Sequence, residues 1–182
     1  MARNSRVWMG VVGSAGYLAL AIGCNPSAFQ RPSVIPLTGG FQSFDVTAGE
    51  PSQQSGTSDL GDLPITLGSG SIEIDPSVIT VTPSGSGKFF TRLQDNDVLR
   101  ITVWVGTIDE EETVCTTGDE YGPYDVTLDE NLVPVSVDPS TVNLRDSTLD
   151  ALNSGEFSLC VEVVSPVTGE VTIESLTFNL GL

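Results

Sequence analysis

Alternation of apolar and polar side chains marks several short segments of this chain, and it is clearest between residues 97 and 108. One set of alternate positions there is entirely apolar: Leu99, Ile101, Val103 and Val105. The intervening positions carry Arg100, Thr102 and Trp104. A period of two predicts a half-buried β-strand, with the apolar set facing a core and the other set facing outward.

Two further segments, 158–164 and 170–180, are strongly patterned and flank a short loop with a glycine. We predict that they form a β-hairpin. The apolar phase of the second segment changes between Ile173 and Leu176, which predicts a β-bulge near 174–175. Weaker signals predict strands at 43–47, 63–67, 71–75, 78–82, 88–93, 124–128 and 132–137.

One short helix is expected, at 147–153, with Ser147 as its N-cap and Gly155 just beyond its end. Many short strands separated by Gly, Pro and Asp predict an all-β chain. We predict a single antiparallel β-sandwich domain over 60–182, immunoglobulin-like or jelly-roll-like.

The segment before this domain, 24–59, is predicted to be a flexible tether with one short strand at 43–47. Residues 25–40 contain three prolines and a Gly-Gly pair, which cannot propagate a helix or an interior strand. Residues 48–59 are polar and are predicted to form a mobile loop or linker.

The amino terminus has the pattern of an export signal. Arg3 and Arg6 precede an uncharged, mostly apolar run over residues 7–23, and small residues close that run. This run is shorter than the ~20 apolar residues that a spanning helix needs, and positive charge before a short apolar core is typical of a secretory signal peptide.

The run ends Leu20-Ala21-Ile22-Gly23-Cys24, which resembles the lipobox of bacterial lipoproteins. Leucine usually stands three places before the cysteine in that family, and here it stands four places before. The resemblance implies that signal peptide 1–23 is removed and that Cys24 is acylated, so that the protein is extracytoplasmic and lipid-anchored to a bacterial membrane. Asn25 favours the outer membrane. The alternatives are a plain signal cut near Cys24 and an uncleaved membrane anchor.

Removal of residues 1–23 takes away two of the seven basic side chains and none of the 24 acidic ones, which leaves a formal charge of −19. Such a chain is repelled by nucleic acid and by anionic lipid headgroups, so the acyl chains would have to hold it at a membrane. Beyond Cys24 only Cys115 and Cys160 remain. We predict that they form a disulfide, with two separate buried thiols as the alternative.

The absence of histidine removes Ser-His-Asp, Cys-His and histidine–metal mechanisms. We therefore expect no catalytic residues, no cofactor and no metal site. Acidic residues concentrate between 95 and 130, but their spacing matches no EF-hand loop, so calcium is kept only as an alternative ligand. The aromatic residues Trp104, Tyr121 and Tyr124 are the candidate ligand contacts of a carbohydrate-binding module.

A short internal echo joins residues 72–79 and 135–142, because both place Asp-Pro-Ser between two apolar-alternating runs. A proline-serine kink of this kind is similar to the opening edge strand of bacterial immunoglobulin-like surface modules, and proline is tolerated at such edges. The echo supports a sandwich, and either a duplication or shared turn chemistry explains it.

The function expected from these observations is that of a non-catalytic cell-envelope lipoprotein, acting as a structural, adhesion or protein-interaction module. Its partner would be a protein or a polysaccharide of the envelope. The alternatives are a calcium- or carbohydrate-binding sandwich and, more remotely, a carboxylate-based glycoside hydrolase.

Overall fold

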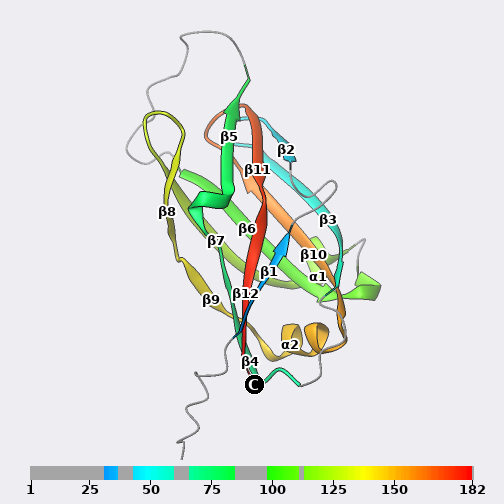
Figure 1. The fold of residues 1–182 in the computed structure, drawn as a ribbon. Helices are drawn as coiled ribbons and strands as arrows, with labels where there is room; N and C mark the ends of the chain where they lie inside the picture. Colours follow the sequence, from blue (N-terminus) through cyan, green and yellow to red (C-terminus); the bar gives the residue numbers. More distant parts are fainter. Residues whose placement is uncertain (1–30, 37–42, 60–65, 85–97, 111–112, 182) are drawn as a thin grey trace, which may run out of the picture.

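The computed structural model describes residues 31–36, 43–59, 66–84, 98–110 and 113–181, and in them the chain is mostly β-strand (Figure 1). The strands are β1 (Arg31–Pro36), β2 (Ser43–Val46), β3 (Pro51–Asp59), β4 (Ser69–Glu73), β5 (Ile79–Pro83), β6 (Val98–Thr107), β7 (Asp119–Leu128), β8 (Pro134–Asp138), β9 (Thr141–Asn143), β10 (Glu156–Val164), β11 (Gly169–Ile173) and β12 (Ser175–Gly181). Two α-helices, α1 (Val114–Thr117) and α2 (Asp146–Asn153), and two 3-10 helices, η3 (Pro76–Val78) and η4 (Ile108–Glu110), connect them.

The strands form three antiparallel sheets. One has five strands in the order β3-β10-β6-β7-β8, one has four in the order β1-β12-β4-β9, and one has three in the order β2-β11-β5. Figure 1 shows β5, β11 and β12 in front of β6 and β10, so the two smaller sheets form one layer and the five-stranded sheet forms the other. The predicted all-β, antiparallel sandwich is therefore the observed class of fold.

The core lies between the two layers. The inward positions predicted for β6 are Leu99, Ile101, Val103 and Val105, and all four are at most 1% exposed. They join one apolar cluster with Phe157 of β10 and Phe178 of β12, whose ring centroids lie 6.0 Å apart. Each such fully buried side chain contributes about 1.5–3 kcal/mol of hydrophobic stabilisation. The period-two pattern thus reports the side of the strand that faces the core.

The hairpin predicted from 158–164 and 170–180 is wrong. β10 lies between β3 and β6 in the five-stranded sheet, whereas β11 pairs with β2 and β5 in the other layer. Both edges of β10 are occupied, so the loop after it crosses from one layer to the other. The apolar phase shift at 174–175 is real, but it marks the break at Glu174 between β11 and β12 rather than a bulge within one strand.

The predicted tether is also corrected where the structure describes it. β1 pairs with β12 at the edge of the four-stranded sheet. An edge strand tolerates prolines such as Pro32 and Pro36, because one of its sides makes no ladder hydrogen bonds. β3, predicted as a mobile linker, pairs with β10 along all nine residues. It is an edge strand without any large apolar residue, so it extends the sheet by backbone pairing and adds no large side chain to the core. The sandwich therefore begins before residue 60.

The predicted helix at 147–153 is confirmed as α2, which begins one residue earlier, and its N-cap is Arg145 rather than Ser147. The expectation of a single helix is wrong because α1 also forms. The predicted strand at 88–93 and residues 63–65 lie outside the described residues, and 66–67 are not in a strand. The strands predicted at 43–47, 71–75, 78–82, 124–128 and 132–137 correspond to β2, β4, β5, β7 and β8.

Both copies of the Asp-Pro-Ser echo connect strands of different sheets. The first lies between β4 and β5, where the Asp75 carboxylate accepts the Ser77 N–H at 2.8 Å and caps η3. The second lies between β8 and β9. The strand before the first turn pairs with the strand after the second, with Ile72 opposite Val142. The shared sequence therefore has a shared structural use, the passage from one sheet to another.

Candidate functional site

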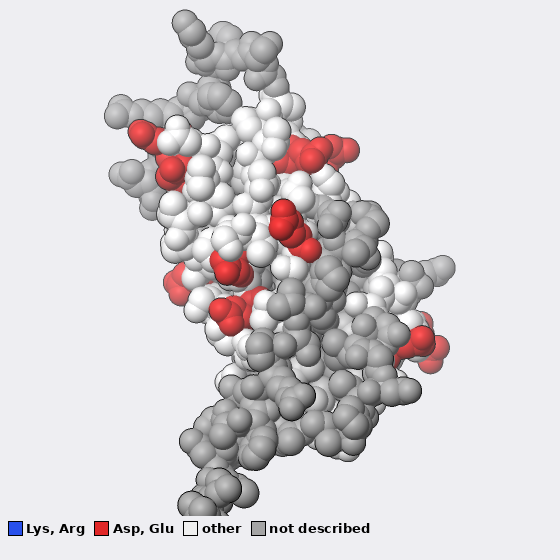
Figure 2. Space-filling model, viewed as in Figure 1, with Lys and Arg blue, Asp and Glu red and all other residues white. Residues whose placement is uncertain are grey.

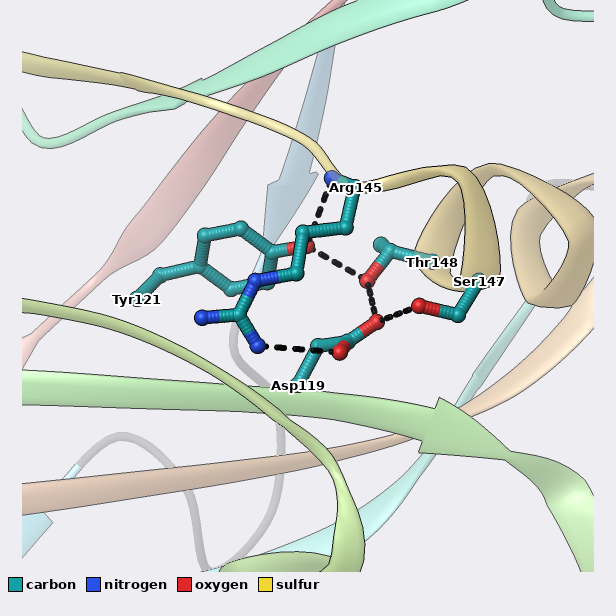
Figure 3. Close-up of polar contacts among 5 residues, drawn as sticks. All are labelled: Asp119, Tyr121, Arg145, Ser147 and Thr148. Atoms are coloured by element: carbon teal, nitrogen blue, oxygen red, sulfur yellow. Dashed lines mark hydrogen bonds and ion pairs between the residues drawn. The ribbon is translucent and has the colours of Figure 1, made fainter.

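The densest cluster of polar side chains lies where the start of β7 meets the first turn of α2 (Figure 3). The Asp119 carboxylate accepts hydrogen bonds from the Ser147 hydroxyl and, at 2.8 Å, from the Thr148 hydroxyl. Its other oxygen accepts the Arg145 guanidinium at 3.1 Å. One carboxylate therefore binds three side chains from the residues that begin the helix.

Tyr121 extends this cluster into the core. Its hydroxyl lies 2.5 Å from Thr148 Oγ1 and accepts the Arg145 backbone N–H at 3.0 Å. Because the only hydroxyl proton of Thr148 goes to Asp119, Tyr121 must donate to Thr148. The result is a directed chain from the Arg145 N–H through Tyr121 and Thr148 to Asp119. Tyr121 and Thr148 are only 2% and 1% exposed, so the chain of hydrogen bonds is shielded from water.

The electrostatics of this cluster favour the ionised form of the Asp119 carboxylate. Burial raises the pKa of Asp119, but hydrogen bonds from Ser147, Thr148 and Arg145 and the charge of Arg145 outweigh burial, so the pKa lies below its ordinary value. A negative charge beside the first turn of a helix also interacts favourably with the helix dipole. Both carboxylate oxygens of Asp119 already accept hydrogen bonds within the cluster. This geometry suits a structural contact that fixes α2 against β7.

The interpretation of Tyr121 and Tyr124 as ligand contacts is wrong, because both are buried, at 2% and 0% exposed. They are three residues apart in β7, yet both face inward, because the register with β6 shifts between Ile101 and Val103. Between these two pairs β7 has more residues than β6, and one of them is Gly122. Its φ is +108°, and a Cβ there would lie 2.9 Å from the Tyr124 nitrogen. The bulge at Gly122 therefore turns both rings into the core.

Tyr124 is unusual because its buried hydroxyl finds no hydrogen-bond partner among the described residues. Burial and, to a lesser extent, the neighbouring Tyr121 raise its pKa above the ordinary range of tyrosine. A buried polar group without a partner costs free energy. Tyr124 therefore stabilises the fold by the packing of its ring and not through its hydroxyl.

Trp104 lies on the outer face of the five-stranded sheet, as predicted, where it is opposite Cys160 and Glu120 in register. It is half-buried. The other aromatic side chains whose surroundings the structure describes belong to the core: Phe44, Tyr121, Tyr124, Phe157 and Phe178. Of its predicted neighbours on that face, Arg100 is exposed, but Thr102 is only 8% exposed. Trp104 is therefore a lone aromatic on this face of the described sheet, not part of a platform.

Cys115 of α1 and Cys160 of β10 form the predicted disulfide, with Sγ atoms 2.14 Å and Cα atoms 5.2 Å apart. The bond holds α1 against the outer face of the five-stranded sheet, where the helix contacts β6 and β10. It closes a loop across a sequence separation of 45.

The acidic side chains in the described segments are dispersed. Figure 2 shows Asp and Glu in separate groups over one face, without Lys or Arg among the coloured residues of that view. Asp125 pairs with Arg100 at 3.1 Å. Asp129 accepts the backbone N–H groups of Val133 and Asn131, and these hydrogen bonds lower its pKa. No group of three Asp, Glu, Cys or His within the described segments is placed to hold a metal ion. Asp95, Asp97, Glu111 and Glu112 lie outside those segments.

Arg3, Arg6 and Cys24, which carry the expected export signal and anchor, lie outside the described residues. None of the helices that the structure describes has the length and apolar character required to cross a bilayer. No protein-family model, curated protein or solved structure matches this chain. The sheets define an antiparallel all-β class of domain.

The Asp119 cluster was missed by sequence reasoning. Asp119 and Tyr121 are separated from Arg145, Ser147 and Thr148 by more than twenty residues, and no local motif links the two groups. Ser147, the expected helix cap, lies in the first turn of α2, but its hydroxyl donates to Asp119 instead of capping the helix.

Proposed function

We propose that this protein is a bacterial cell-envelope lipoprotein, held outside the cytoplasm by acyl chains on Cys24, whose β-domain serves as a non-catalytic structural, adhesion or protein-interaction module. The lipobox-like ending at Cys24 supports the anchor. The Cys115–Cys160 bond supports the location, because disulfides persist in oxidising compartments and are rare in the cytoplasm. That bond is the observation that carries the proposal furthest.

The chemistry of the polar cluster supports a non-catalytic role. A carboxylate-based glycosidase needs one carboxyl group with a raised pKa to protonate the leaving group. Asp119 has its pKa lowered, and Ser147, Thr148 and Arg145 occupy its oxygens. Its contacts hold α2 in place, which is a structural task.

The position of the aromatic residues favours a protein partner over a carbohydrate. Sugar platforms use exposed aromatic rings, and two of the three candidate rings, Tyr121 and Tyr124, are in the core. A surface with many acidic side chains keeps such a module soluble and attracts cationic groups.

Metabolic labelling with radioactive palmitate tests the anchor. The wild-type chain should take up label and fractionate with membranes, whereas Cys24→Ala should take up none. Cys115→Ala is the matched control, because it removes a different thiol and should retain the label. Equal labelling of wild type and Cys24→Ala would refute the proposal.

A further inference from the structure

We infer that the end of the sandwich that carries α2 faces the membrane, and that the opposite end, with the turns at 47–50, 129–133 and 165–168, faces away from it. This inference rests on the proposed lipid anchor at Cys24.

The first step is the place where the chain enters the fold. Arg31, the first residue of β1, lies opposite Leu180 near the end of β12. Leu180 lies opposite Gly70 of β4, whose carbonyl accepts the Leu144 N–H at 2.8 Å. Leu144 directly precedes Arg145, the N-cap of α2. The chain therefore enters at the end of the domain where α2 begins.

The carboxyl end of α2 is held at the same end of the domain. The Asn153 side chain accepts the Leu67 N–H at 2.7 Å and donates to the Leu67 carbonyl at 3.3 Å. Gly68, the next residue, donates to the carbonyl of Gly181 at 3.0 Å. Figure 1 shows α2 and the carboxyl end of the chain at the bottom of the molecule, with the turn between β7 and β8 at the top. Both ends of α2 are thus fixed beside the entry point.

The second step is the length of chain that leads to the anchor. Seven residue steps separate Cys24 from Arg31, and a fully extended chain of that length spans at most about 25 Å. β11 and β12 follow one another along the long axis of the sandwich in Figure 1. Eleven residue steps separate Leu180, opposite Arg31, from Gly169 at the start of β11, and they span about 36 Å at the rise of a β-strand. An inverted domain would place Arg31 beyond the reach of the lipid. The α2 end must therefore lie nearer the bilayer.

Charge supports orientation by the tether rather than by adsorption to lipid. Asp146, Asp150 and Glu156 are exposed at the α2 end, and anionic headgroups repel them. Adsorption to anionic headgroups therefore does not set the orientation, and the tether does. At the far end, Val133 is 53% exposed in the turn after β7, so each end has an exposed position that can carry a label.

Energy transfer to the bilayer tests this orientation in the full lipidated chain. Two variants, Asp150→Cys at the near end and Val133→Cys at the far end, carry a donor fluorophore on the new thiol. Each is reconstituted in phosphatidylcholine vesicles with a small fraction of rhodamine-labelled phosphatidylethanolamine, and co-flotation with the vesicles is recorded first. Transfer should be higher from position 150 than from position 133. Equal transfer in chains that co-float, or a higher transfer from position 133, would overturn the inference while the anchor stands.

The control lengthens the tether. An insert of about twenty glycine and serine residues after Asn25 would raise the root-mean-square length of the tether to about 30 Å. The difference between the two positions should then shrink. A difference that persists unchanged would show that the tether does not set the orientation. Chains that fail to co-float would refute the anchor itself, and with it the inference that depends on the anchor.

Discussion

Two buried tyrosines in one strand offer a matched test of the polar cluster. Tyr121→Phe and Tyr124→Phe each remove one hydroxyl from β7 and leave the ring in the core. The Tyr121 hydroxyl has two partners, the Arg145 N–H and the Thr148 hydroxyl, whereas the Tyr124 hydroxyl has no partner among the described residues. The same substitution should therefore have opposite effects.

The magnitudes follow from what each change leaves behind. Tyr121→Phe removes two hydrogen bonds. It leaves the Arg145 N–H without its acceptor and the buried Thr148 oxygen without the donor that it accepts from, although Thr148 still donates to Asp119. The free energy of unfolding should therefore fall by about 1–3 kcal/mol. Tyr124→Phe removes a desolvated hydroxyl at no loss of hydrogen bonds, so it should be neutral or stabilising by up to about 1 kcal/mol.

Urea unfolding of residues 25–182 with the disulfide intact measures both effects, with the slope of each transition checked for constancy. For a domain of this size 1 kcal/mol corresponds to about 2–4 °C in Tm, so thermal unfolding should rank the variants in the same order. Equal destabilisation by the two substitutions, or a neutral Tyr121→Phe, would refute the account of the cluster.

Three further changes test other parts of the fold. Replacing both Cys115 and Cys160 by alanine should lower the free energy of unfolding by about 4 kcal/mol in the chain-entropy model, as urea titration would show, and no loss would contradict the role of the disulfide. Gly122→Ala should destabilise by more than Gly49→Ala, because both glycines have a positive φ but only a Cβ at 122 meets backbone atoms; equal melting temperatures would contradict this. The lowered pKa of Asp119 stabilises the fold above about pH 4, and this contribution is lost as the pH falls through the folded-state pKa. Acid titration of Asp119→Asn should therefore show a shallower loss of stability than wild type, and identical acid profiles would contradict the assignment.

The strands with alternating apolar residues were predictable because one face of each packs against the single apolar core between the layers. In β6 the pattern identified Leu99, Ile101, Val103 and Val105 as inward, and the structure confirms all four. The pattern failed for β3, because a polar edge strand that packs few large side chains has no apolar period to detect. It failed for β1 because prolines at an edge read like prolines in a loop.

Strand pairing was not predictable from local patterns. β10 and β11 follow each other in sequence and were expected to pair, but each finds both of its partners elsewhere in the chain. A two-layer fold makes such crossings necessary, and the residues of the connecting loop carry no sign of them. The inward turn of Tyr121 and Tyr124 was missed for a similar reason, because the bulge at Gly122 depends on β6 across the sheet.

The cysteines were the most informative residues at the sequence level. An even pair beyond Cys24 predicted the Cys115–Cys160 bond, which the structure confirms. The Asp119 cluster could not be predicted, because its members come from distant segments and each residue type is ordinary on a protein surface. Its existence depends on α2 packing against the start of β7.

Mass spectrometry of the mature protein purified from membranes shows whether Cys24 is the lipidated amino terminus. We expect a chain that begins at Cys24, with a mass increased by a diacylglyceryl group on the thiol. An intact leader, or an unmodified amino terminus at any other residue, would contradict it.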